Sequence, residues 1–204
     1  MSSGAISVAA SSPLSRFTDP EVLVSGEYAH SSFAGPVWVR GGGSGGTAGA
    51  GGAGGSGGAG GWWRVDLGEG RRLRCNHYTM RQDGSTNFPR QWELQGHAGD
   101  GATEAGWITL KRHDGDATLC GPGQWGSWPV ESAAAALPVR FLRLKLTGPT
   151  TAGRGGRAGP ELEAGRGGGC GAAAAAAEAL RLCVCSVEFY GLLTHAGGQK
   201  VAKW

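Results

Sequence analysis

The sequence predicts an all-β sandwich, and three observations support that prediction. Several short segments alternate apolar and polar residues, as a strand does when one of its faces lies in a core. Turn-forming residues separate these segments at intervals of about 10–15 residues, which is typical of sandwiches. No amphipathic helix of convincing length occurs in the 204 residues. The strongest strand candidates are residues 62–68, 76–81, 90–96, 106–113, 126–130, 139–148 and 182–193.

The first strong candidate, residues 62–68, follows directly after a glycine-rich tract. Its alternation places Trp63, Val65 and Leu67 on one face and Trp62 on the other. We expect the first three in the core, because large apolar side chains dominate sandwich interiors. Trp62 is a candidate for either a surface or a packing position.

The next candidates continue the pattern. Residues 76–81 consist largely of strand formers and lead into a QDGS turn, and residues 90–96 alternate again. Residues 106–113 run into an HDGD turn. Residues 126–130 contain Pro129, which indicates an edge strand because proline cannot donate to a neighbouring strand. On this pattern the tryptophans expected in the core are Trp63, Trp92, Trp107 and Trp128.

The last candidates lie toward the C-terminus. Residues 139–148 alternate most regularly, with leucines on one face and basic residues on the other. Residues 5–12 and 21–26 are weaker strand candidates near the N-terminus. Residues 182–193 place a further set on one face, consisting of Cys183, Cys185, Val187 and Phe189.

Two low-complexity stretches, residues 41–61 and 151–179, interrupt the pattern. Glycine-rich chain loses much backbone entropy on ordering and offers few apolar side chains, so we expect both stretches to be flexible inserts. Long inserts are tolerated because loop-closure entropy grows slowly with length. The sequence therefore predicts one domain over residues 1–193 with both inserts inside it, and a flexible tail over residues 194–204. It also predicts sheet contacts between the segments on either side of the first insert.

Composition narrows the partners and the compartment. A net charge of +3, from 19 basic and 16 acidic residues, is too balanced to indicate nucleic-acid binding. No stretch reaches the roughly 20 apolar residues of a membrane span, and the first residues do not resemble a signal peptide. The number of cysteines, 5, is odd, and Cys183 and Cys185 lie two apart on one strand, where side chains do not normally bridge. We therefore expect free thiols and a cytoplasmic location.

The order of these motifs resembles the discoidin-like domains, also called coagulation factor five/eight type C domains, of the galactose-binding-like superfamily. The resemblance is nearest to the intracellular branch in HECT-type ubiquitin ligases and BTB-domain proteins. It implies an eight-stranded jelly-roll sandwich and a non-catalytic binding role, in which divergent loops take glycans, lipid head groups or protein segments. One departure is Gln82, which stands where the family pattern has histidine. The matching residues are Trp63, 65–68, 77–81, 92–96, Trp107, Leu110, His113, Asp116, Leu119, 127–129, 141–144, 147–149 and 187–191.

The loops indicate where a ligand would bind, because recognition residues of a rigid sandwich usually lie there. Residues 81–90 combine cationic, anionic and amide side chains, and the HDGD turn adds a histidine and carboxylates. That turn is either a polar binding loop, a source of calcium ligands, or a turn whose side chains bond their own backbone. Too few oxygen ligands are visible locally for calcium, so we expect no metal or cofactor. The expected ligand-binding residues are Arg81, Asp83, Asn87, Arg90, His113, Asp116 and Trp125.

No catalytic site is expected. Asp66 has no second carboxylate at a useful spacing, and we expect it to accept hydrogen bonds from the backbone or an arginine. Cys183 and Cys185 form at most half of a zinc site. The predicted function is recognition of a protein segment or glycan, for partner or substrate selection in a ubiquitin-ligase or BTB-type context. The alternatives are a carbohydrate-binding module of a glycan-processing system and a purely structural scaffold domain.

Overall fold

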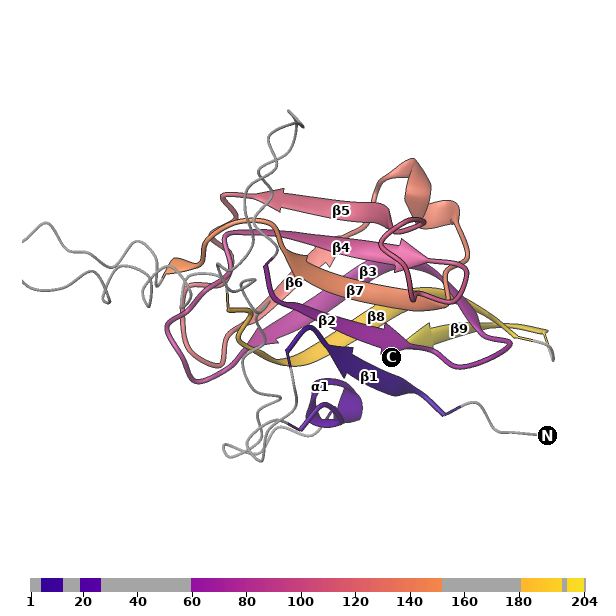
Figure 1. Cartoon of the computed structure of the whole chain (residues 1–204), viewed down its shortest axis with the longest axis horizontal. Helices are drawn as coiled ribbons and strands as arrows, with labels where there is room; N and C mark the ends of the chain where they lie inside the picture. Colours follow the sequence, from indigo (N-terminus) through magenta and orange to yellow (C-terminus); the bar gives the residue numbers. More distant parts are fainter. Residues whose placement is uncertain (1–4, 13–18, 27–59, 152–180, 196–197, 204) are drawn as a thin grey trace, which may run out of the picture.

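The predicted all-β sandwich is confirmed by the strand pairing. The computed structural model describes residues 5–12, 19–26, 60–151, 181–195 and 198–203. Within these ranges the strands form two antiparallel sheets that stack face to face as a β-sandwich (Figure 1).

The larger sheet has five strands in the order β1-β2-β7-β4-β5. Ala9 of β1 lies opposite Arg64 of β2, so the sheet contact predicted between the two sides of the first insert is present. Most of that insert, and nearly all of the second one, lie outside the described residues. The strands are β1 (Ser7–Ala10), β2 (Trp62–Asp66), β7 (Phe141–Leu146), β4 (Gln91–His97) and β5 (Ile108–Asp114).

The smaller sheet has four strands in the order β6-β3-β8-β9. Pro129 lies in β6 at the edge of this sheet, as predicted. β9 pairs with the second half of β8. This strand lies within residues 194–204, for which the sequence predicted a flexible tail. The strands are β6 (Trp125–Pro129), β3 (Arg72–Gln82), β8 (Val184–His195) and β9 (Gly198–Lys203), and a short 3-10 helix, η1 (Ala133–Ala136), lies between β6 and β7.

The core fills the space between the two sheets. Trp63, Trp92 and Trp128 are buried in it, as the alternation predicted. Each fully buried large apolar side chain contributes about 1.5–3 kcal/mol relative to exposure. Trp107 differs from its prediction, because it is half-buried on the outer face of the larger sheet, where it packs against Arg143. The largest fully buried side chains also include Tyr78, Phe189, Leu23, Leu67, Leu73, Met80, Leu94, Leu110, Leu119 and Leu142.

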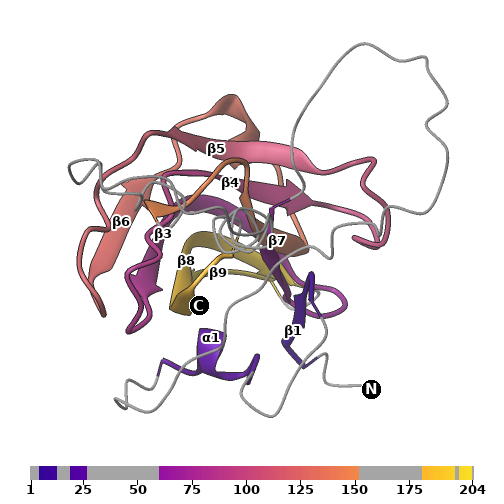
Figure 2. The same cartoon turned by 60° about the vertical axis from the view of Figure 1, so that its left-hand side comes forward.

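Residues 21–26, a weak strand candidate, form the short helix α1 (Val22–Ser25) instead. Gly26 ends the helix with a φ of 71°, a left-handed conformation that glycine adopts readily. Leu23 is fully buried and belongs to the core cluster. The helix packs against β8 and lies next to β1, at the bottom of Figure 2.

β3 extends beyond the predicted residues 76–81 because it continues through a β-bulge between Cys75 and His77. Gly191 of β8 lies opposite Cys75 and has a φ of 153°. A Cβ at this glycine would collide with the carbonyl oxygen of Arg74. The bulge therefore requires glycine at this position.

We predict that Gly191→Ala lowers the free energy of unfolding by about 2 kcal/mol or more, because strained backbone and steric overlap act together. Denaturant unfolding measures the change. Gly84→Ala is the matched control, since nothing lies within 4 Å of a Cβ there. The control should shift stability by less than about 0.5 kcal/mol. A Gly191→Ala chain as stable as the control would contradict this account of the bulge.

Candidate functional site

The expected ligand-binding residues all lie at one end of the sandwich, which we call the loop end (left in Figure 1). The loop from β3 to β4 and the loop from β5 to β6 both lie at this end. β7 ends here, because Leu146 lies opposite Trp92 at the start of β4. β8 begins here, because Val184 lies opposite Gln82 at the end of β3. β2 begins at this end as well, because Trp62 lies opposite Lys145. Loops from several strand pairs therefore meet over one edge of the core.

Three of the expected residues gather around Gly123, and we call them the rim: Arg81, Asp83 and Trp125. Arg81 and Trp125 are paired across β3 and β6. The Nε of Arg81 donates to the carbonyl of Gly123 at 3.0 Å, and the amide of Gly123 donates to the carbonyl of Asp83 at 2.9 Å. The Trp125 side chain is 38% exposed, and the other two are half-buried. The rim thus combines a cation, a carboxylate and an exposed indole.

Asp83 shapes the first turn after β3. Its Oδ1 accepts a hydrogen bond from the Ser85 amide at 2.8 Å and one from Gln82 Nε2 at 3.2 Å. Asn87 lies behind the rim, with its Nδ2 3.9 Å from the sulfur of Cys183. Burial raises the pKa of Cys183 to about 11, and the nearby Asp83 carboxylate acts in the same direction. The thiol is therefore protonated at neutral pH and serves as a small buried group.

Sequence reasoning missed Gln124, which organises the loop between β5 and β6. Its Oε1 accepts hydrogen bonds from the amides of Cys120 and Gly121, both at 2.9 Å. Its Nε2 donates to the carbonyl of Thr118 at 2.8 Å. No signal in the sequence separates this glutamine from one that faces solvent, because its partners are backbone groups.

Arg90 holds the same loop from the other side. Its Nη1 donates to the carbonyls of Asp116 at 2.9 Å and Leu119 at 2.7 Å. Its guanidinium also lies 5.8 Å from the centroid of the Phe88 ring. The structure therefore brings Arg90 to the loop as a support for the backbone and separates it from the rim.

His113 and Asp116 face the interior and are bonded to each other. His113 is 4% exposed, and its ring stacks parallel to Trp92 with centroids 4.0 Å apart. Its Nδ1 lies 2.7 Å from Asp116 Oδ2, which also accepts a hydrogen bond from Trp128 Nε1 at 2.9 Å. Asp116 Oδ1 accepts the backbone amide of Thr118 at 2.8 Å. This placement matches the turn that bonds its own backbone, one of the alternatives weighed for the HDGD motif.

Tyr78 extends this network across the core. Its hydroxyl accepts a hydrogen bond from Trp92 Nε1 at 2.9 Å and lies 2.7 Å from His113 Nε2. Because the Asp116 carboxylate only accepts, the proton of the neutral His113 ring lies on Nδ1, and Nε2 is left to accept the proton of the Tyr78 hydroxyl. The imidazole therefore donates its own proton to Asp116. Every polar atom in this chain of contacts has a partner.

The charges in this network are fixed by burial and by hydrogen bonds. Burial lowers the pKa of His113, and the bond to Asp116 only partly offsets this. Desolvation raises the pKa of Asp116, but hydrogen bonds from Thr118 and His113 outweigh it and leave the pKa below its usual value. At neutral pH the pair is thus a neutral imidazole and a carboxylate.

The residues weighed for catalysis and metal binding have structural partners. Asp66 Oδ1 accepts hydrogen bonds from the Gly68 amide at 2.8 Å and Arg140 Nε at 2.7 Å, as predicted for it. Among the described residues, no group of three or more His, Cys, Asp or Glu side chains is arranged to hold a metal ion. In the same part of the chain, no helix has the length and hydropathy needed to cross a bilayer.

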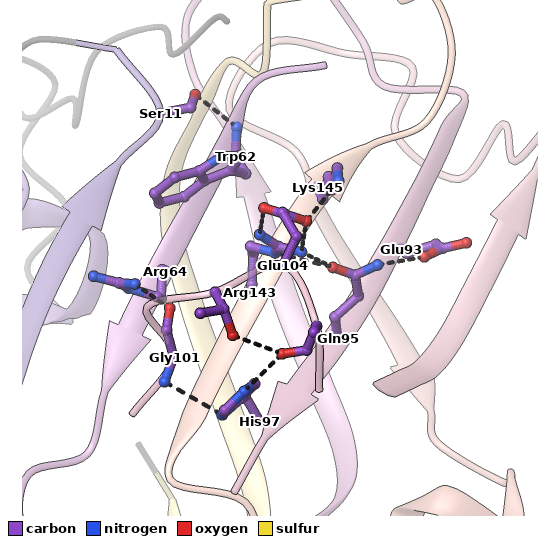
Figure 3. Close-up of polar contacts among 12 residues, drawn as sticks. Ser11, Trp62, Arg64, Glu93, Gln95, His97, Gly101, Glu104, Arg143 and Lys145 are labelled. Carbon is purple, nitrogen blue, oxygen red and sulfur yellow. Dashed lines mark hydrogen bonds and ion pairs between the residues drawn. The ribbon is translucent and has the colours of Figure 1, made fainter. Parts of the chain in front are cut away.

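A second polar cluster, which sequence reasoning did not single out, lies on the outer face of the larger sheet (Figure 3). Arg143 of β7 is 2% exposed, because residues 98–107 fold back over it. Its Nη1 donates to Glu104 Oε1 at 2.7 Å, its Nε donates to Gln95 Oε1 at 2.9 Å, and its guanidinium lies 4.0 Å from the Trp107 ring centroid. The strand alternation predicts only that Arg143 faces outward. It does not predict that a loop covers this face and buries the side chain.

Trp62 and Arg64 border the same cluster. Trp62 is half-buried, and its ring centroid lies 5.8 Å from each of the guanidinium carbons of Arg64 and Arg143. Arg64 Nη1 donates to the carbonyl of Gly101 at 2.6 Å, and His97 Nδ1 accepts the Gly101 amide at 3.3 Å. Trp62 is thus a packing residue of the outer face, whereas Trp63 belongs to the core.

Comparison with known proteins gives one sequence relative and several structures of similar fold. No family model matches the chain. A BTB/POZ domain-containing protein of Arabidopsis thaliana is 48% identical over 145 residues, which are 71% of this chain and 16% of that protein. The chain therefore spans about a sixth of the length of this relative.

The similar structures include carbohydrate-binding modules and an F5/8 type C domain. The CBM32-6 module produced by Clostridium perfringens matches with a TM-score of 0.45 at 10% identity, over 91% of this chain and 93% of that one. A chitosan-binding module of a Paenibacillus chitosanase/glucanase, in complex with chitotriose, matches with 0.41 at 16% identity, over 69% and 82%. An F5/8 type C domain from Bacteroides fragilis matches with 0.37 at 15% identity, over 65% of each chain.

The low pKa of His113 predicts how stability depends on pH. Near pH 6.5 the unfolded imidazole takes up a proton while the buried one stays neutral, so protonation favours the unfolded chain. The free energy of unfolding should therefore fall as the pH is lowered from about 7.5 to about 5. His113→Asn retains a donor for Asp116 but does not titrate, so it should remove this part of the slope. Urea unfolding at several pH values measures it, and an unchanged slope in the variant would contradict the assignment.

Proposed function

We propose that the chain is a non-catalytic recognition module whose rim contacts a polar protein segment. The observation that supports this most directly is the gathering of Arg81, Asp83 and Trp125 around Gly123 at the ends of paired strands. A polypeptide offers donors, acceptors and charges of both signs, and this rim offers a complement to each. An indole and a guanidinium are also the side chains that most often dominate binding energy at protein interfaces.

The support beneath the rim favours binding without large rearrangement. Arg81 and Gln124 fix the loop between β5 and β6 on one side, and Arg90 fixes it on the other. A surface that is already ordered loses less conformational entropy on binding. We expect the backbone of the rim to move little when a partner binds.

The sequence relative suggests the context in which such a module would act. That relative is a BTB/POZ domain-containing protein, and the region matching this chain is a small part of it. We propose that the module selects partners or substrates for a larger BTB-type or ubiquitin-ligase assembly, within the cytoplasm. This proposal rests on the relative and on the motifs that resemble the intracellular discoidin-like branch.

A glycan is the second candidate ligand, and the exposed indole of Trp125 favours it. A sugar ring can stack on such an indole while Arg81 and Asp83 hydrogen-bond its hydroxyl groups. The two candidates differ in their response to a glycan array, because a protein-binding rim gives no specific signal there.

Rim substitutions separate these possibilities. Asp83→Asn removes the charge and keeps an oxygen for the Ser85 amide, and Trp125→Ala removes the indole. We predict that each lowers recovery of specific partner proteins in quantitative affinity purification, by about tenfold for Trp125→Ala, as for an interface hot spot. Glu131→Gln, an exposed charge change outside the rim, is the matched control and should bind as the unaltered chain does.

Two outcomes would redirect the proposal. Partners recovered equally with all three variants would exclude the rim as the binding surface. The glycan would instead be supported as ligand if the chain bound specific glycans on the array and Trp125→Ala lost that binding. In that case no protein partner should depend on the rim residues.

A further inference from the structure

The outer face of the larger sheet contains a cation that is almost sealed from water. The Arg143 side chain is 3% exposed, although it points away from the sandwich core. The Trp107 ring centroid lies 4.0 Å from its guanidinium carbon, and that of Trp62 lies 5.8 Å from it (Figure 3). A charge so far from water requires a paired anion, because leaving it uncompensated is strongly unfavourable.

Glu104 supplies that anion from the solvent side. Its Oε1 accepts Arg143 Nη1 at 2.7 Å and its Oε2 accepts Arg143 Nη2 at 3.1 Å, so the pair is bidentate. Lys145 Nζ lies 3.4 Å from the same Oε2. These contacts hold the pKa of Glu104 at about 2, mainly through the hydrogen bonds from Arg143. The Glu104 side chain is nevertheless 70% exposed, so a molecule in solution can reach the position of its carboxylate.

No second carboxylate in the described ranges hydrogen-bonds Arg143. Glu93 lies nearby on the same face, but its Oε1 accepts Arg112 Nη2 at 2.6 Å. Its Oε2 accepts Gln95 Nε2 at 2.6 Å and Thr109 Oγ1 at 3.0 Å. If Glu104 moves away, Arg143 therefore needs an anion from outside the cluster.

The backbone of the loop that carries Glu104 is held on both sides of that residue, since the carbonyl of Ala105 lies 3.3 Å from His97 Nε2 and Gly101 is held on the other side. Arg64 and His97 hold the backbone of Gly101, while residues 102–106 are exposed. Gly106 follows with a φ of 90°, which adds backbone freedom beside Glu104. Glu104 can therefore leave Arg143 without breaking the contacts of Gly101.

We propose that Arg143, whose guanidinium lies against the rings of Trp62 and Trp107, forms together with Lys145 a carboxylate-binding subsite that Glu104 fills in the free chain. The proposed ligand is the side chain of a glutamate in an acidic protein segment. Its carboxylate takes the two Arg143 donors, Lys145 attracts it, and its methylene groups pack on the indoles. The exchange replaces one bidentate pair by an equivalent one, so the buried cation is never left without an anion. This subsite lies on the sheet face, away from the rim, and does not depend on the proposed function.

The test uses the full chain with Glu104→Ala and two blocked peptides, acetyl-Gly-Glu-Gly-amide and acetyl-Gly-Gln-Gly-amide. The Nε–H resonance of Arg143 in nitrogen-15 NMR reports binding. Without the competing Glu104, the variant should bind the glutamate peptide at least about tenfold more tightly than the unaltered chain does. It should also prefer that peptide to the glutamine peptide by at least about tenfold, since a charged partner strengthens both hydrogen bonds.

A control variant and a measurement on the unaltered chain make the proposal falsifiable. Glu131→Ala removes an exposed carboxylate elsewhere and should bind as the unaltered chain does. If Glu104→Ala does not fold, the unaltered chain still carries the subsite, and high concentrations of the glutamate peptide must shift the Arg143 resonance there. The proposal would be overturned if the Arg143 resonance did not shift with the glutamate peptide in any folded chain. It would also be overturned if the two peptides shifted this resonance equally. Glu104 would then be a clamp for its loop only.

Discussion

The structure depends on a chain of hydrogen bonds that crosses the core between the two sheets. Trp92 donates to Tyr78, Tyr78 donates to His113, and His113 donates to Asp116, which also accepts from Trp128. Tyr78 and Trp128 belong to the smaller sheet, whereas Trp92 and His113 belong to the larger one. An unpartnered polar group in this position would cost about 1–3 kcal/mol, so the network admits few other arrangements of these strands.

This network also determines where the loop between β5 and β6 begins. Asp116, just after the end of β5, is bonded to His113 in the core through its side chain. Its backbone carbonyl accepts a hydrogen bond from Arg90 Nη1. Farther along, Gly123 is held by Arg81 and Asp83. The loop is thus fixed by the core at its start and by the rim at its end. The rim, with the exposed Trp125, is in this way coupled to a contact in the interior of the sandwich.

The sequence predicted the architecture well because apolar alternation depends on neighbours along the chain. It placed Trp63 in the core and Pro129 at an edge, and both positions follow from local pattern. It missed the interior role of His113, because the partner hydroxyl of Tyr78 comes from a distant strand. It likewise assigned Trp107 to the core, since alternation does not show that a loop folds back over the outer face. Pairings between distant residues are what local patterns leave out.

The central claim is that the buried network holds the loop between β5 and β6 in place, and native-state hydrogen exchange of Tyr78→Phe tests it most directly. This variant removes the hydroxyl between Trp92 and His113. The amides of Asp116 and Gly123, which bond to Arg90 and Asp83, should then exchange at least about tenfold faster. The amide of Ser11, bonded to Trp62 away from the loop, should change much less. If the Asp116 and Gly123 amides kept their protection while the core strands lost theirs, the network would stabilise the sandwich without positioning the loop, and the account would be wrong.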